Sequence, residues 1–435
     1  PLEVELAHWV AADQVAVAAA RYRVLYAEIG AARCVALPGA AEAVRAVRAA
    51  GGRAVVVTAK YGPNAARCLT HAGIDVDEII GDRWGAAKGE ALAAEGADVY
   101  VGDHVSDVAG ARIAGAHSVA VATGPCSAAE LRAAGADTVI ESLTDLTGWL
   151  SEHLLDRRLG ALEERLRELG SVLVAFSGGA DSAFLLAAAA RTLGPDGVVA
   201  ATAVSPSLPA AELAGARDFA ASLGVRHLTP ATRELDRADY RANPRNRCYF
   251  CKAELTEVLG PLAPELGLAH IVTGTNADDL VAGFRPGIRA AAERGAATPL
   301  AAAGLTKAQV RAASRRWGLV TWDKPAAACL SSRVAYGIPI TTERLARVEN
   351  AESTMRAALV AAGLPTRDLR IRDLGTLSLG TGHHGDVARV EVDAELVDRL
   401  AARPDLWATL PGFDRVELDP RGFRSGSMND LLSAE

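Results

Sequence analysis

The sequence lacks a long apolar run, although 50% of its 435 residues are hydrophobic. No uninterrupted apolar stretch is long enough to cross a bilayer, and the first residues do not form a secretory signal. These absences predict a soluble, cytoplasmic protein without a membrane partner. The chain also lacks long basic runs, and its formal net charge is -7. Because dedicated nucleic-acid binders are usually basic, we expect no nucleic-acid partner.

Cysteine is scarce, since the chain has 6 cysteines, which is too few for a disulfide scaffold in a protein of this size. Cys34, Cys68 and Cys126 occur singly in the first third, and we expect them to be small core or surface residues. Cys248 and Cys251 form a C-x-x-C pair in the second half, which needs a separate explanation.

A chain of 435 residues is too long for one small core, so several domains are expected. The pattern of strands and helices predicts an α/β domain at 1–150, a doubly wound parallel-sheet domain at 151–342 and a small α+β domain at 343–435. The expected strands are 53–58, 98–102, 172–176, 369–372, 387–392 and one directly before Lys324, and the expected helices include 40–50, 64–72, 156–169 and 183–191.

The sequence SGGADS at 177–182 lies between an apolar strand pattern and a helix pattern. Glycines let the backbone approach an anion, and the start of the following helix presents N–H groups and a positive dipole end to it. The expected ATP- and pyrophosphate-binding residues are Ser177, Gly178, Gly179, Asp181 and Ser182, with Asp181 as the ligand of Mg2+.

No Gly-Lys-Ser/Thr follows these glycines, so the loop is not a Walker A motif. It resembles the PP-loop of the ATP pyrophosphatase superfamily, whose members adenylylate a substrate oxygen and release pyrophosphate. The alternative is an ordinary glycine turn before a helix, which six matching positions in a strand-turn-helix context disfavour.

Thr58, Lys88, Asp103 and Asp107 occur in an order that resembles haloacid dehalogenase-like phosphatases. The resemblance implies that Thr58 and Lys88 hold a phosphate and that Asp103 and Asp107 bind Mg2+. The family's nucleophile belongs to a D-x-D-G motif, which does not occur before Thr58. We expect that motif to lie upstream of Pro1, and the alternative is a degenerate domain retained for packing or assembly. The chain as given is expected not to form an aspartyl-phosphate.

Several motifs between about Val172 and Asp430 resemble the LarE family. They are GTNADD at 274–279, RPG at 285–287, KPAAACLSSR at 324–333, YG at 336–337 and GFRSG at 422–426. The resemblance implies an ATP-dependent sulfur transferase of nickel-pincer nucleotide biosynthesis. Such an enzyme adenylylates the carboxylates of pyridinium-3,5-biscarboxylic acid mononucleotide and converts them to thiocarboxylates. We also expect a homo-oligomer and a separate sulfide donor.

Two sulfur sources are open for such an enzyme. In one, Cys329 attacks the acyl-adenylate itself and is left as dehydroalanine. In the other, Cys248, Cys251 and Cys329 ligate a 4Fe-4S cluster whose fourth iron carries sulfide, and the C-x-x-C pair favours this route. Alternatives for the pair are a redox motif at a helix start and half of a zinc site.

The resemblance also implies a set of substrate-site residues. They are Asp278, Arg285, Arg333, Glu352, Arg370, Arg372, Arg389, Glu391 and Arg424. Arg370 and Arg372 alternate along an expected strand, so both should point to one face and could bind a phosphate. For Glu352 and Arg389, ordinary surface ion pairing is an equal alternative.

Three other functions compete with sulfur transfer to a small molecule. A PP-loop tRNA thiolase would use the same ATP site but should carry a basic surface or an RNA-binding domain. An amide-forming synthetase would have no use for grouped cysteines. An iron-sulfur carrier would not need a pyrophosphate site.

Overall fold

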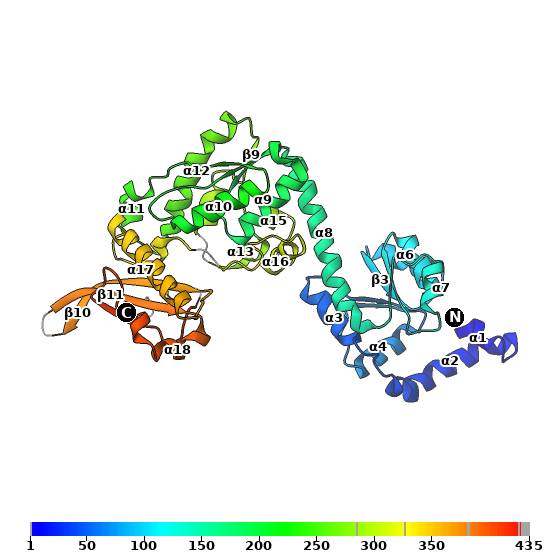
Figure 1. The fold of residues 1–435 in the computed structure, drawn as a ribbon. Coiled ribbons are helices and arrows are strands. Elements are labelled where there is room, and N and C mark those ends of the chain that lie inside the picture. The colour runs from blue at the N-terminus through cyan, green and yellow to red at the C-terminus, as the bar shows by residue number, and fades with distance from the viewer. Residues whose placement is uncertain (1, 284–285, 326–327, 381–382, 425–426, 428–435) are drawn as a thin grey trace. The chain divides into compact units, whose positions relative to one another are not determined.

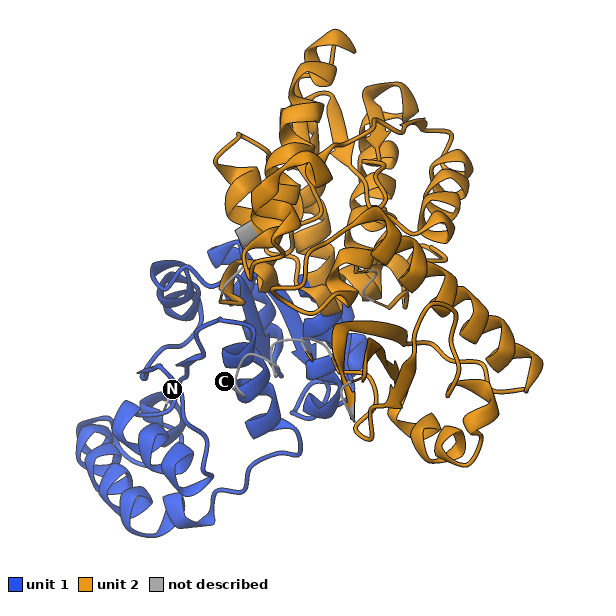
Figure 2. Cartoon of the chain, turned by 90° about the vertical axis from the view of Figure 1, so that its left-hand side faces the viewer, with its two compact units in different colours: residues 1–154 blue, residues 155–435 orange. Residues whose placement is uncertain are grey.

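The computed structural model describes residues 2–283, 286–325, 328–380, 383–424 and 427. The chain separates into two compact units, residues 1–154 and residues 155–435 (Figures 1 and 2). Helix α8 (Leu146–Leu169) runs across the boundary, which confirms the predicted helix at 156–169. The predicted α/β architecture is also confirmed, whereas the division into three domains stays a prediction.

The first unit begins with a helical segment and continues as parallel α/β structure. The helical segment consists of α1 (Leu2–Leu6), η1 (Ala12–Gln14), α2 (Val15–Leu25), η2 (Tyr26–Gly30) and η3 (Ala31–Arg33). The strands are β1 (Val55–Val57), β2 (Glu78–Ile80), β3 (Val99–Gly102), β4 (His117–Val121) and β5 (Thr138–Ile140). The helices among them are α3 (Ala40–Ala49), α4 (Gly62–His71), α5 (Ala86–Ala94), α6 (Val105–Ala114), α7 (Ala128–Ala133) and η4 (Leu143–Asp145).

The strands of the first unit form two separate parallel sheets, β1-β2 and β3-β4-β5. Tyr100 on β3 donates a hydrogen bond from its hydroxyl to the carbonyl oxygen of Val57 on β1 at 3.4 Å. The two residues also belong to one apolar cluster, which includes Leu92 of α5. The sheets are therefore connected by side chains, without a backbone ladder between them.

The second unit is built on a four-stranded parallel sheet with the order β8-β7-β6-β9. Its strands are β6 (Val172–Ala175), β7 (Val198–Ala201), β8 (Arg226–Leu228) and β9 (His270–Thr273). The chain moves outward from β6 to β8 and then returns to the other side of β6 with β9. The strand order thus reverses between β6 and β9, and doubly wound sheets bind ligands at such a point.

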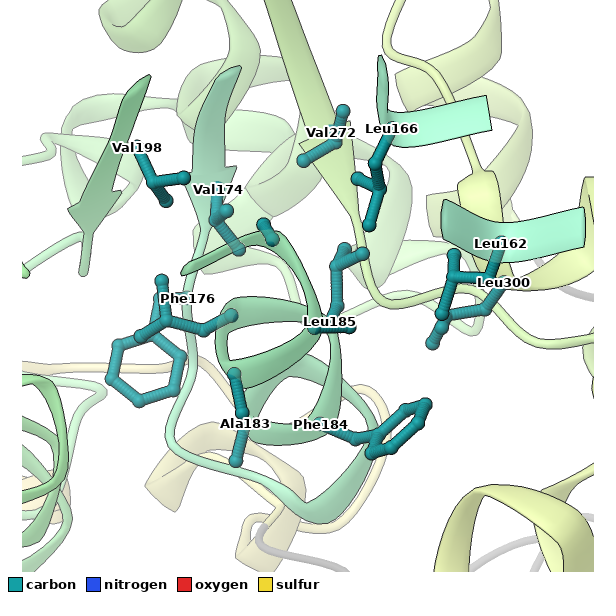
Figure 3. Packing of buried hydrophobic residues seen from close by; sticks show 14 of the residues in the cluster. Leu162, Leu166, Val174, Phe176, Ala183, Phe184, Leu185, Val198, Val272 and Leu300 are labelled. Atoms are coloured by element: carbon teal, nitrogen blue, oxygen red, sulfur yellow. The ribbon is translucent and has the colours of Figure 1, made fainter. Parts of the chain in front are cut away.

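Helices cover both faces of this sheet. The helical elements of this part of the chain are α9 (Ala180–Leu193), η5 (Pro195–Gly197), α10 (Ala210–Ser222), η6 (Glu234–Asp236), α11 (Ala238–Arg241), α12 (Arg247–Glu265), α13 (Ala277–Val281), α14 (Pro286–Ala292), α15 (Pro299–Ala302), α16 (Lys307–Arg316) and η7 (Leu330–Arg333). Val174 packs with Phe184 and Leu185 of α9 on one face (Figure 3). Leu173 packs with Leu259 of α12 on the other, so β6 is buried on both faces, as its apolar sequence predicts.

The predicted strand before Lys324 is wrong. The chain leaves α16 through Gly318, which has a positive φ of 69°, and then forms a turn. In this turn the Trp322 N–H donates to the Leu319 carbonyl oxygen at 3.1 Å. Leu319 packs against the core of the sheet domain, so burial of one apolar residue, and not strand pairing, accounts for the apolar pattern.

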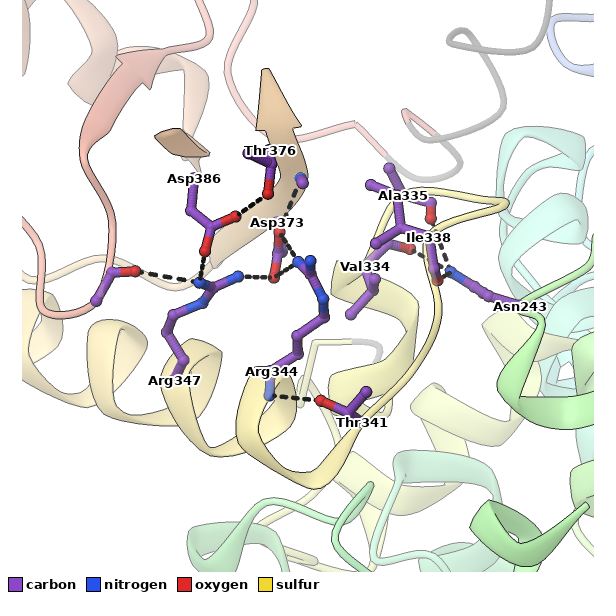
Figure 4. Close-up of polar contacts among 12 residues, drawn as sticks. Asn243, Val334, Ala335, Ile338, Thr341, Arg344, Arg347, Asp373, Thr376 and Asp386 are labelled. Carbon is purple, nitrogen blue, oxygen red and sulfur yellow. Dashed lines mark hydrogen bonds and ion pairs between the residues drawn. The ribbon is translucent and has the colours of Figure 1, made fainter. Parts of the chain in front are cut away.

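The last part of the second unit has α+β structure, as the sequence predicts, and its three strands form a mixed sheet. Its elements are α17 (Thr342–Ala361), β10 (Leu369–Gly380), β11 (His383–Val392), η8 (Ala394–Leu396), α18 (Val397–Ala401), η9 (Pro404–Leu406) and β12 (Arg415–Leu418). Strand β11 pairs antiparallel with β10 and parallel with β12. Arg344 and Arg347 of α17 bind the fully buried Asp373 of β10 at 2.9 and 2.6 Å, which fixes the helix on the sheet (Figure 4).

None of the helices in the described ranges is long and apolar enough to span a membrane.

Candidate active site

The loop between β6 and α9 has the backbone and hydroxyl arrangement of an anion site. Gly178 has a positive φ of 70°, and an added Cβ would lie 3.3 Å from the Cβ of Ala216. The Ser177 and Ser182 hydroxyl oxygens are 3.1 Å apart, and Ser182 donates to the Gly179 carbonyl oxygen at 3.1 Å. The hydroxyls therefore hold the turn in place at the start of α9.

The end of β9 approaches the start of α9 closely. A Cβ on Gly274 would lie 2.7 Å from the Ser182 nitrogen, so only glycine fits there. The adjoining segment contributes Asn276, whose side-chain amide donates to Asp181 at 3.3 Å. The strands on both sides of the reversal point thus bring their following loops together at Asp181.

Two lysines surround this loop. The Lys307 ammonium forms an ion pair with the Asp181 carboxylate, and the Lys307 backbone N–H donates to Asp278 at 2.8 Å. The Lys324 ammonium donates to the Gly178 carbonyl oxygen at 3.0 Å and pairs with Glu212 at 2.7 Å. Each lysine is therefore held beside the glycine loop by a carboxylate, and phosphate binding at this loop stays a prediction.

The three cysteines of the second unit influence one another electrostatically. Cys248 and Cys251 lie one turn apart at the start of α12, and Cys329 directly precedes η7. Desolvation, followed by the charge of Cys329, raises the pKa of the Cys251 thiol to about 12. The same two causes raise the pKa of Cys248, whose side chain is exposed but has protein around much of it. Ligation of a cluster by these three cysteines stays a prediction.

A buried group of hydroxyls holds the segment that follows Cys329. The hydroxyl oxygens of Ser207, Tyr240 and Ser331 are 2.8 to 3.0 Å from one another. The Leu330 N–H also donates to the Ser207 carbonyl oxygen at 2.8 Å. Burial, followed by the charges of Cys329 and Cys251, raises the pKa of Tyr240, so it stays a neutral hydrogen-bonding group.

Arg333 connects the Cys329 segment to the C-terminal sheet. Its guanidinium donates to the Cys329 carbonyl oxygen at 2.9 Å and to Glu352 of α17 at 3.0 Å. Glu352 also accepts a hydrogen bond from the Ile371 N–H at 3.1 Å. Both side chains are largely buried, so the surface ion pair considered for Glu352 is in fact an interior contact between three segments.

Arg370 and Arg372 share one face of β10, as the alternation predicts. Arg372 lies opposite Arg389 and Arg370 opposite Glu391, so these four side chains belong to the same face. Arg372 pairs with Glu391 at 2.7 Å. Desolvation, followed by the charge of Arg333, lowers the pKa of Arg370, which is mostly buried. Crowding of like charges on a buried face is unfavourable unless an anion offsets it.

The other predicted substrate residues lie in varied surroundings. Arg389 forms a half-buried ion pair with Glu417 at 3.4 Å, so it has the ion-pair partner considered from the sequence. Arg424 is half-buried, and its carbonyl oxygen accepts from the Ser427 N–H at 3.1 Å. Arg285 lies outside the described residues. Their binding roles stay predictions.

The phosphatase-like residues of the first unit lie beside two different sheets. Lys88 and Asp107 form a buried ion pair at 2.6 Å, and Asp107 also accepts hydrogen bonds from the N–H groups of Asp103 and His104 at 3.2 Å each. Thr58 follows β1, in the other sheet, and its hydroxyl accepts from the Lys60 N–H at 3.1 Å. Phosphate and Mg2+ binding by Thr58, Lys88, Asp103 and Asp107 stay predictions.

Sequence reasoning missed the residues that hold the site together. Lys307 is the first residue of α16, where a positive charge opposes the helix dipole, and this mismatch was a usable signal. Asn243 is fully buried and donates to the carbonyl oxygens of Val334, Ala335 and Ile338 (Figure 4). Nothing in the sequence around Asn243 indicates those distant partners.

Comparisons with known proteins give two family models and two similar proteins. A family model described as haloacid dehalogenase-like hydrolase matches residues 3–112, and a HAD-hydrolase-like model matches residues 86–146. An uncharacterized protein of Synechocystis is 39% identical over 285 residues, which cover 64% of this chain and 100% of that protein. The pyridinium-3,5-bisthiocarboxylic acid mononucleotide synthase of Lactiplantibacillus plantarum is 33% identical over 282 residues, covering 64% of this chain and 96% of that enzyme.

An N-terminal region of the haloacid dehalogenase type is thus joined to a match that spans nearly the whole length of the Lactiplantibacillus enzyme. Together with the glycine loop at the strand reversal and the coupled cysteines, this similarity shows that the chain belongs to the LarE family of PP-loop sulfur transferases.

Proposed function

We propose that the second unit uses ATP to adenylylate a substrate carboxylate and then converts the acyl-adenylate to a thiocarboxylate. The observation that carries this proposal is the hydrogen bond from Lys324 to Gly178 at 3.0 Å. Lys324 begins the segment that leads to Cys329, so one side chain connects the ATP loop to the sulfur-bearing segment. Activation and sulfur transfer are sequential steps on one carboxyl group, and they require such adjacent sites.

The glycine loop would bind the phosphates of ATP through the N–H groups at the start of α9 and the hydroxyls of Ser177 and Ser182. Asp181 is the proposed ligand of Mg2+ on the leaving pyrophosphate. The contact between Asp181 and Lys307 supports this role, because the carboxylate already attracts a cation in the protein alone. Lys307 would then be released to pair with a phosphate oxygen. An oxygen of the substrate carboxylate then attacks the α-phosphorus of ATP, and pyrophosphate leaves.

Cys248, Cys251 and Cys329 are the proposed ligands of a 4Fe-4S cluster. In the described part of the chain, no three His, Cys, Asp or Glu residues form a group that could hold a single metal ion. The charge of Cys329 acts on both thiols of the C-x-x-C pair, which supports three cysteine ligands, and three ligands leave one iron of such a cluster open. When bound, the cluster would supply an exchangeable sulfide. The thiols would lose their protons on ligation, and the positive charge of the iron would offset the unfavourable burial of the thiolates.

The proposed substrate is pyridinium-3,5-biscarboxylic acid mononucleotide, on the route to the nickel-pincer nucleotide. The name of the Lactiplantibacillus relative describes the corresponding bisthiocarboxylic product. The arginine face of β10 supports a nucleotide substrate, because Arg370 and Arg372 share that face and would hold its phosphate. Arg333, which contacts both the Cys329 segment and Glu352, would keep the sulfur-bearing segment facing that substrate.

The test is anaerobic incubation of the full chain with ATP, Mg2+, sulfide and the biscarboxylate nucleotide, followed by mass spectrometry of products and protein. We expect AMP, pyrophosphate and thiocarboxylate, with no loss of sulfur from the protein. A protein lighter by the mass of hydrogen sulfide would instead identify Cys329 as a sacrificial donor. If a parallel incubation with unmodified tRNA yields AMP and thiolated tRNA, while the nucleotide yields no thiocarboxylate, the substrate assignment is wrong.

A further inference from the structure

Two cysteines of the first unit, far apart in the sequence, have their sulfur atoms in contact. Cys34 directly follows η3, and Cys68 lies on α4. The Cys34 thiol donates toward the Cys68 sulfur across only 2.6 Å, compared with about 2.05 Å in a disulfide bond. Both thiols are free and half-exposed, so a small molecule can reach them.

Polar groups around the pair favour a thiolate at Cys68. The Tyr26 hydroxyl lies 3.4 Å from the Cys34 sulfur and 3.6 Å from the Cys68 sulfur. The Lys60 ammonium donates to the Tyr26 hydroxyl at 2.7 Å and to the Cys68 sulfur at 3.6 Å. Although desolvation acts in the opposite direction, hydrogen bonds from Cys34 and Tyr26 and the charge of Lys60 lower the pKa of Cys68.

The geometry points to a thiol-disulfide exchange site at Cys34 and Cys68, which reacts with small-molecule disulfides such as oxidised glutathione. Cys68 is the attacking thiol, because a positive neighbour and hydrogen-bond donors surround it. Cys34 is the resolving thiol, because its sulfur is already in contact with that of Cys68.

The exchange takes place in two balanced steps. The Cys68 thiolate attacks one sulfur of oxidised glutathione, the disulfide bond of glutathione breaks, and one glutathione thiolate leaves. Cys34 then loses its proton to solvent and attacks the Cys68 sulfur, which displaces the second glutathione thiolate. The protein gives up two electrons and two protons, and the glutathione disulfide is reduced to two thiols.

The new bond would connect the helical N-terminal segment to the α/β part of the same unit. Cys34 ends the helical segment, whereas Cys68 belongs to the helix that follows β1. Lys60, which contacts Cys68, donates its backbone N–H to Thr58, a predicted phosphate-binding residue. Oxidation therefore changes the contacts of a side chain next to the predicted phosphate site.

The test incubates the reduced full chain with oxidised glutathione, alkylates the remaining thiols and maps the peptides by mass spectrometry. We expect a Cys34–Cys68 cross-linked peptide about 2 Da lighter than its two parts, because two hydrogens are lost. Cys126, the third cysteine of this unit, serves as the internal control and should stay alkylated. If Cys34 and Cys68 are both alkylated after the incubation, or if Cys126 reacts as fast, the proposal is wrong.

Three variants assign the roles of the groups. Cys34→Ser should trap glutathione on Cys68, whereas Cys68→Ser should leave Cys34 free over the same time. The exposed Lys60→Gln should slow formation of the cross-link about threefold to tenfold, because it removes the charge that favours the thiolate. A stable glutathione adduct on Cys34 in the Cys68→Ser variant, formed at the original rate, would contradict the assignment of Cys68 as the attacking thiol.

Discussion

In the second unit, Cys248 and Cys251 lie beside the charge of Cys329, and desolvation together with that charge raises the pKa of both thiols. In the first unit, Cys68 has a lysine and two hydrogen-bond donors around it, and its pKa is lowered. The same residue type is thus prepared for different chemistry by its neighbours. A thiol with a raised pKa stays protonated until a metal displaces its proton, whereas a thiolate near a cation suits attack on a disulfide.

The largest expected effect is a loss of pyrophosphate release on substitution in the ATP loop of the second unit. Asp181→Ala should reduce pyrophosphate release by at least about 100-fold, because it removes a group proposed to stabilise the leaving charge. Pyrophosphate release, measured with a coupled assay, is the readout. Asp196→Ala, at an exposed position of the same unit, is the matched control and should retain full activity. Undiminished release in Asp181→Ala would mean that the metal site is misassigned.

Visible absorbance tests whether Cys248 of the second unit and Cys68 of the first unit differ in cluster binding. Cys248→Ala should abolish the visible absorbance of the anaerobically reconstituted protein, because a cluster ligand is lost. Cys68→Ala should keep the full absorbance, since Cys68 belongs to the other unit. An unchanged spectrum in Cys248→Ala would remove this residue from the proposed ligand set, and a lost spectrum in Cys68→Ala would abolish the distinction between the units.

The pH dependence of thiol alkylation in the metal-free protein tests the electrostatic contrast directly. A raised pKa means that thiolate forms only at higher pH, so the alkylation rate of Cys251 should keep rising to pH 10 and beyond, toward its pKa of about 12. A lowered pKa means that thiolate is present at lower pH. The alkylation rate of Cys68 should therefore level off below pH 9.0, the pKa of an ordinary cysteine thiol. Quantitative mass spectrometry of each peptide gives both profiles, and identical profiles would refute the contrast.

The smallest expected effect concerns the hydroxyls below the Cys329 segment. Tyr240→Phe should lower the free energy of unfolding of the second unit by about 1 kcal/mol, because it removes a buried hydroxyl while Ser207 and Ser331 keep each other as partners. Denaturant unfolding measures the change. Tyr249→Phe, which loses only an exposed contact to Glu293, should have a smaller effect. Equal effects would mean that the buried group does not stabilise the segment.

Much of the second unit was predictable because its strands and turns are indicated by residues that are adjacent in the sequence. The run at 172–176 and the glycines after it require only short-range preferences, and they correctly predict β6, the turn and α9. The strand before Lys324 was mispredicted, since an apolar run of that length does not distinguish a strand from a turn packed on a core.

The contacts that the sequence could not predict join residues that are distant along the chain. Cys34 and Cys68 were expected to be unremarkable core or surface residues, because nothing near either of them indicates the other. The same holds for Lys307 with Asp181 and for Lys324 with Gly178. Each of these pairs arises from the packing of the whole unit, and the residues beside them in the sequence carry no information about the partner.

Helix α12 determines which part of the cysteine site is able to change. Cys248 and Cys251 lie within its first turns, where a rise of about 1.5 Å per residue fixes their separation. The spacing of their Cα atoms is therefore a property of the helix. A backbone movement that changes the spacing of the three cysteines would thus come from Cys329. Its segment starts at Lys324, so the binding of a nucleotide at Gly178 is the event best placed to alter that spacing.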